Sequence, residues 1–142
     1  MTELKKTIID QNSYLQELQK ILETELHLIS SRDAEALINL LKTKETLLET
    51  IQQQDNLISS LYMQSSQELK DNAEIIALFD SAKEMVIQCR YRTQINQTAV
   101  EQGQLRLAHL RNLLLESRAK ESMTYDKSGK TRGGPPSGGV SA

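Results

Sequence analysis

Few residues of this chain have the types and spacing that catalysis or metal binding requires. His27 and His109 are the only histidines and stand far apart, and Cys89 is the only cysteine. A zinc site needs several such ligands at short spacings, so we expect no metal and no cofactor. Residues 128–131 read Ser-Gly-Lys-Thr, like the end of a phosphate-binding loop, but the first glycine of that motif and a preceding strand are missing. We therefore predict that the protein is not an enzyme and has no catalytic residues.

Glycine and proline, which interrupt regular structure, are distributed very unevenly along the chain. From Met1 to Ser128 there is one glycine, Gly103, and no proline, whereas the last fourteen residues hold five glycines and two prolines. The long first stretch is rich in Leu, Gln, Glu, Lys and Ala, which favour helix. This pattern predicts an all-α protein with a C-terminal tail. Proteins of this kind mostly bind other proteins.

Charge and composition exclude several partners. The net charge is −2, which gives no case for nucleic acid, although the span from Arg106 to Arg132 carries a net +4. No apolar run approaches the roughly 18 residues of a membrane span, so no membrane insertion is expected. A single cysteine excludes an internal disulfide and favours a reducing compartment. We predict a cytoplasmic protein.

The first two helices are predicted from apolar residues at heptad spacing. The first helix, from about Thr2 to about Ser30, has Thr2 as a cap and a seam with two polar members. That seam consists of Leu4, Ile8, Gln11, Leu15, Leu18, Leu22, Glu25 and Ile29. After a break at residues 30–33, where Ser31 or Asp33 can cap, a second helix follows. Lys44 falls on its apolar face, and we expect its stem to pack while its ammonium reaches the rim.

A third, longer helix is predicted after a break at residues 64–72. It runs from Asp71 or Asn72 to about Lys120, or ~68 Å, against ~43 and ~50 Å for the first two. The fold predicted is an elongated antiparallel bundle of three long helices. Its domain boundaries are 1–120 for the helical part and 121–142 for a disordered Gly/Pro-rich tail.

The seam of the third helix turns polar in its middle. Thr93, Asn96 and Gln97 stand where apolar residues are expected, and Gly103 follows two turns later. A polar layer of this kind can fix the register of a bundle. The alternative is a hinge near Gly103, where the helix would bend or fold back. The sequence leaves both interpretations open.

Beyond Gly103 the apolar stripe becomes too wide for one seam. Three successive leucines, 113–115, cover an arc of about 200°, whereas a core-facing stripe needs little more than about 100°. Part of this surface must meet another protomer, another part of this chain or a partner, so we predict a binding site here. Its residues are Leu105, Leu107, Leu110, Leu113, Leu114 and Leu115.

Three motifs together resemble the FlgN family of flagellar export chaperones over nearly the whole chain. The second helix carries Leu-Leu-x-x-Lys-x-x-Leu-Leu at residues 40–48, and the tail carries Thr-Tyr-x-x-x-Gly at residues 124–129. The long third helix has Gln102-Gly103 where the family shows an Asn-Gly pair, so the glycine alone is kept. The tail motif is the most specific of the three.

The resemblance implies a function. Such chaperones hold flagellar hook-associated proteins, which form the hook–filament junction, in the cytoplasm, prevent their premature assembly and deliver them to the flagellar type III export gate. The family binds its client through the C-terminal part of the long helix, here Gly103–Lys120. The client would supply its C-terminal helix. The family's tail tyrosine docks at the cytoplasmic domain of the gate, and here that residue is Tyr125.

Two alternatives stay open at this stage. The same leucines would also serve a structural coiled-coil protein that associates with itself, and we expect a monomer or weak homodimer. Tyr125 is either a docking residue or a tyrosine that folds back on the bundle.

Overall fold

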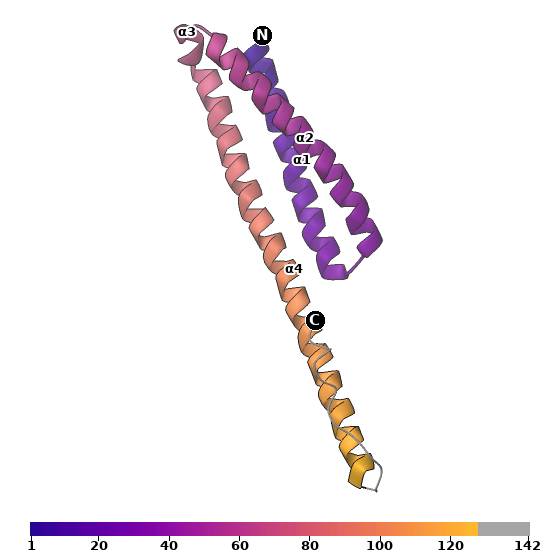
Figure 1. Cartoon of the computed structure of the whole chain (residues 1–142). Helices are drawn as coiled ribbons and strands as arrows, with labels where there is room; N and C mark the ends of the chain where they lie inside the picture. The colour runs from indigo at the N-terminus through magenta and orange to yellow at the C-terminus, as the bar shows by residue number, and fades with distance from the viewer. Residues whose placement is uncertain (128–142) are drawn as a thin grey trace. The chain divides into compact units, whose positions relative to one another are not determined.

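The computed structural model describes the backbone of residues 1–127 and the side chains of residues 1–119, and within that backbone every regular element is helical. The elements are α1 (Glu3–Ser31), α2 (Ala34–Gln64), α3 (Gln67–Lys70) and α4 (Ala73–Lys127) (Figure 1). The all-α prediction is confirmed. The predicted count of three helices is wrong by one short helix, because Ser66 in the second break accepts a hydrogen bond from the Leu69 amide at 3.2 Å and caps α3.

The helix starts follow from short polar side chains. Thr2 Oγ1 accepts from the Lys5 amide at 3.2 Å, and Asp33 Oδ1 accepts from the Ala36 amide at 3.1 Å, as their positions predicted. Between α1 and α2, Arg32 adopts a left-handed conformation with φ 60°. Its amide and that of Asp33 donate to the carbonyls of Ile29 and Leu28, closing the last turn of α1.

Contacts between side chains define the helix directions in the first hundred residues. Gln11 of α1 reaches Ile51 and Asp55 of α2, and α1 and α2 lie side by side as an antiparallel hairpin (Figure 1). Along α4, Cys89 donates to the carbonyl of Leu15. Asn96, seven residues further on, donates to Leu22. The first part of α4 therefore runs parallel to α1.

The buried positions of α1 match the predicted seam almost completely. Its seam members from Leu4 to Glu25 are all buried, including Gln11 and Glu25. Four of them, Leu4, Ile8, Leu18 and Leu22, belong to two apolar clusters that join three helices. The first comprises Leu4, Ile8, Ile58 and Ile75, and the second Leu18, Leu22, Leu47 and Cys89. Burial raises the pKa of the Cys89 thiol, although nearby Arg92 opposes the shift.

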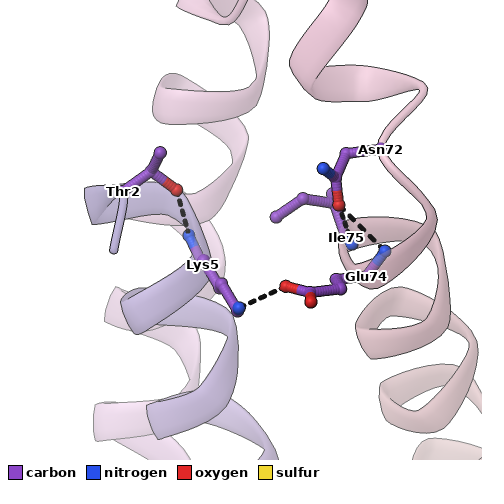
Figure 2. A network of polar contacts seen from close by, with 5 residues as sticks. All are labelled: Thr2, Lys5, Asn72, Glu74 and Ile75. Atoms are coloured by element: carbon purple, nitrogen blue, oxygen red, sulfur yellow. Dashed lines mark hydrogen bonds and ion pairs between the residues drawn. The ribbon is translucent and has the colours of Figure 1, made fainter.

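A polar network joins the beginnings of α1 and α4 (Figure 2). Asn72 caps α4, since its Oδ1 accepts from the amides of Glu74 at 2.9 Å and Ile75 at 3.3 Å. The Lys5 ammonium donates to the Glu74 carboxylate across the two helices. That hydrogen bond and the charge of Lys5 lower the pKa of Glu74. Ile75, next to this network, is buried in the first cluster.

The described chain divides at the polar stretch of α4. One compact unit is Met1–Val100, and the second begins at Glu101. Helix α4 was expected to end near Lys120, but it extends to Lys127, consistent with the absence of glycine and proline from residues 121–127. The predicted disordered tail lies outside the described residues from 128 onward. The domain boundary at 120 stays a prediction.

Candidate docking surfaces

The predicted client-binding leucines lie on the second unit with much of their surface accessible. Leu105, Leu107 and Leu110 are 53–67 % exposed, and Leu113 and Leu114 are 47 % and 56 % exposed. Leu115 is half-buried. We call these six residues the leucine segment. Fully burying one leucine is worth about 1.5–3 kcal/mol, so this segment offers a partner a large apolar surface.

A buried polar layer ties the three long helices of the first unit together. Glu25 of α1 accepts from Lys44 Nζ at 2.9 Å and from Asn96 Nδ2 at 2.6 Å, and the same Asn96 amide group donates to the Leu22 carbonyl at 3.0 Å. Glu25 is 5 % exposed and Asn96 4 %. The Lys44 ammonium therefore turns inward to a carboxylate instead of reaching the rim. These contacts fit the polar-layer alternative for Asn96, and the hinge near Gly103 stays a prediction.

A groove that the sequence analysis did not predict runs along the first unit. Its walls are α2 and the N-terminal part of α4, α1 forms its floor, and its hollow measures about 620 Å³. A second hollow of about 340 Å³ shares Leu15, Ile51, Asp55 and Val86 with the first, so the two adjoin along the same helices. At one end, Tyr62 and Phe79 meet edge to face at 5.5 Å, with the Lys70 ammonium 5.0 Å from the tyrosine ring. We call this feature the α2–α4 groove.

The residues that could do chemistry are not brought together. His27 and His109 are exposed on different helices and Cys89 is buried. Among the residues whose side chains are described, no cluster of His, Cys, Asp or Glu could hold a metal ion. None of the helices in the described part is long and apolar enough to cross a membrane. The Ser-Gly-Lys-Thr stretch at 128–131 lies outside the described residues.

Tyr125 is placed only through its backbone. It belongs to the last turns of α4, and its side chain lies outside the described set. The two sequence-predicted sites, the leucine segment and Tyr125, are thus on one helix. Their roles stay predictions.

The groove escaped prediction because heptad spacing identifies inward faces without giving the distance between helices. A signal was nevertheless present on α2. Leu41, Leu48, Asp55 and Tyr62 follow each other at seven, and all four are exposed. Of these four, Asp55 and Tyr62 line the groove, so the exposed row marks part of its α2 wall.

Comparison with known families gives one match. The model of a family described as FlgN protein matches residues 1–133 of the chain. Searches of curated proteins and of solved structures gave no significant match.

Proposed function

Because the chain belongs to the FlgN family and is thereby a flagellar export chaperone, we propose that its clients are flagellar hook-associated proteins. In this proposal the chaperone binds the client in the cytoplasm, covers the surfaces through which it would assemble early, and delivers it to the type III export gate. The leucine segment binds the C-terminal helix of the client. Tyr125 docks at the cytoplasmic domain of the gate.

The exposure of the leucine segment carries this proposal. Leu107, Leu110 and Leu114 occupy one face of α4 at helical spacing, and each is more than half exposed. In helix-in-groove recognition, apolar side chains at i, i+3 and i+7 serve as the anchors of the contact. An amphipathic helix of a client is the occupant that suits this surface.

The test removes two leucines and measures client affinity. Leu110→Ala with Leu114→Ala should weaken binding of a purified hook-associated protein by two orders of magnitude or more in calorimetric titration, because two apolar anchors are lost. The matched control is Ile87→Ala with Tyr91→Ala, which removes exposed apolar groups from α4 within the first unit. Helicity should be unchanged in both. Normal binding by the leucine variant would contradict the proposed site.

The docking role of Tyr125 is tested separately. Tyr125→Ala should lower the affinity of the chaperone–client complex for the cytoplasmic domain of the gate, while client affinity stays within twofold. Docking by a single ring is expected to be weak, because one buried side chain offsets little of the entropy that association costs. Equal gate affinities for the wild type and the variant would remove Tyr125 from the delivery step. Tyr91→Ala, a tyrosine of the first unit, is the control.

A stable dimer in solution would favour the alternative of a self-associating coiled-coil protein. Light scattering coupled to size exclusion measures the mass directly. We expect a monomer or weak dimer that exchanges for a one-to-one complex when client is added. A dimer that persists with excess client would contradict the chaperone proposal.

A further inference from the structure

The α2–α4 groove has the length and lining of a helix-binding site. On α4 its lining extends from Ile76 to Thr93, or about 26 Å along the helix axis. On α2 it extends from Ile51 to Tyr62, or about 17 Å. A hollow elongated along the helix axes in this way matches a helix of three to four turns.

The floor of the groove contains a buried acceptor without a partner. Gln11 is 3 % exposed, and its Nε2 donates to the Ile51 carbonyl at 3.0 Å and to Asp55 Oδ1 at 2.8 Å. Its Oε1 is buried and accepts no hydrogen bond from the side chains and backbone that the structure describes. An unpaired buried acceptor is destabilising, because it has lost its hydrogen bond to water and gained none. A groove occupant with a polar hydrogen in its apolar stripe would satisfy it.

The charges on the walls distinguish between possible occupants. Asp55 is the charged residue of the α2 wall, whereas Lys83, Arg90 and Asp80 line the α4 wall and Lys70 lies at the end. The side formed by α3 and α4 thus carries a net +2. An apolar helix with carboxylates on one flank complements that side.

The leucine segment of a second copy does not have this charge pattern. At 100° per residue, Arg106 falls on one flank of the face made by Leu107, Leu110 and Leu114, and Arg111 and Arg118 fall on the other. Whichever way the second copy's helix ran along the groove, one or more of its arginines would face Lys83 and Arg90. A second copy is therefore disfavoured as the occupant.

We propose that the α2–α4 groove binds an amphipathic, acid-flanked helix of the client, as a second docking site in addition to the leucine segment. This inference rests on the proposed function for the identity of the occupant. The client helix lays its apolar stripe on the half-buried Ile51, Phe79 and Val86, directs carboxylates toward Lys83 and Arg90, and donates one hydrogen bond to Gln11 Oε1. Two separate sites on one chaperone would raise its avidity for a client that presents both helices.

The groove is tested first with two designed peptides of fourteen residues. Both carry the same Leu/Ile stripe with one Asn at its centre and Gln on one flank. The other flank is Glu in one peptide and Lys in the other. In whichever direction each peptide binds, the Glu flank can reach Lys83 and Arg90, whereas the Lys flank finds Asp55 alone on the α2 wall. Fluorescence anisotropy with the full-length protein should show at least tenfold tighter binding of the Glu peptide. Equal affinities, or no binding of either peptide, would overturn the inference.

Variants of the walls locate the peptide. Ala82→Trp fills the groove and should abolish binding of the Glu peptide, whereas Ser81→Trp, on an exposed residue outside the lining, should leave it unchanged. Lys83→Glu with Arg90→Glu should reverse the preference so that the Lys peptide binds better. A reversal cannot arise from misfolding, so this variant supports the groove even where Ala82→Trp is destabilised. Preservation of the Glu preference in the reversed protein would overturn the site.

The last experiment measures binding of a purified hook-associated protein. Its outcomes distinguish failure of this inference from failure of the proposed function. Ala82→Trp should weaken client binding at least tenfold relative to Ser81→Trp. If the wild type and both variants bind the client equally, the groove inference fails and the proposed function stands. If the wild type does not bind the client, the proposed function fails, and so does the assignment of the occupant. Loss of a wild-type dimer in Ala82→Trp would identify a second copy as the occupant and overturn the inference.

Discussion

Two sets of leucines in this molecule have the same spacing and opposite surroundings. Leu15, Leu18 and Leu22 of α1 are 4 %, 7 % and 1 % exposed, whereas Leu107, Leu110 and Leu114 of α4 are 54 %, 53 % and 56 % exposed. Both sets follow the i, i+3, i+7 pattern of one helical face. The spacing therefore determines which residues share a face, and the neighbouring elements determine whether that face contributes to stability or to binding.

The largest expected effect on stability comes from replacing one leucine of each set with alanine. Leu22→Ala should lower the free energy of unfolding by about 2–5 kcal/mol, because a fully buried side chain leaves a cavity. Leu110→Ala should change it by no more than about 0.5 kcal/mol, since an exposed site has no core contacts to lose. Urea denaturation followed by circular dichroism measures both. Similar losses in the two variants would show that the leucine segment is part of the folding core.

An intermediate effect is expected at the polar layer that ends the buried seam. Lys44→Ala leaves the Glu25 carboxylate buried with Asn96 as its remaining side-chain partner, and should cost about 1–3 kcal/mol of stability. Lys44→Ala combined with Glu25→Ala should cost less than the two single variants added together, since the pair is removed as a unit. The control is Lys42→Ala, an exposed lysine on the same helix. Additive losses in the cycle would mean that the two side chains do not interact.

The sequence predicted the inward face of each helix better than the distances between helices. Heptad spacing placed Leu4 and Ile8 in the core, and short polar residues placed the caps at Thr2 and Asp33, because both signals act within a few residues of chain. The short helix α3 was missed, since four residues carry no periodicity and only the cap Ser66 marks it. The inward turn of Lys44 was missed as well, because its partner Glu25 lies across the hairpin. The α2–α4 groove depends on how far apart two helices stand, which no local pattern encodes.

The smallest expected effect concerns Gly103, which stands between the two leucine sets compared above. It lies in the interior of α4, and a Cβ added there would meet no atom within 4 Å. Gly103→Ala should therefore remove the conformational freedom of glycine without a clash, and raise helix stability by about 0.5–1 kcal/mol. Thermal unfolding followed by circular dichroism would register this as a higher transition temperature. If α4 acts as one continuous helix, client affinity should stay unchanged in Gly103→Ala. If the helix must bend at Gly103 for the leucine segment to receive a client, the same variant should gain stability and lose affinity, which would establish the hinge that the polar stretch of α4 left open.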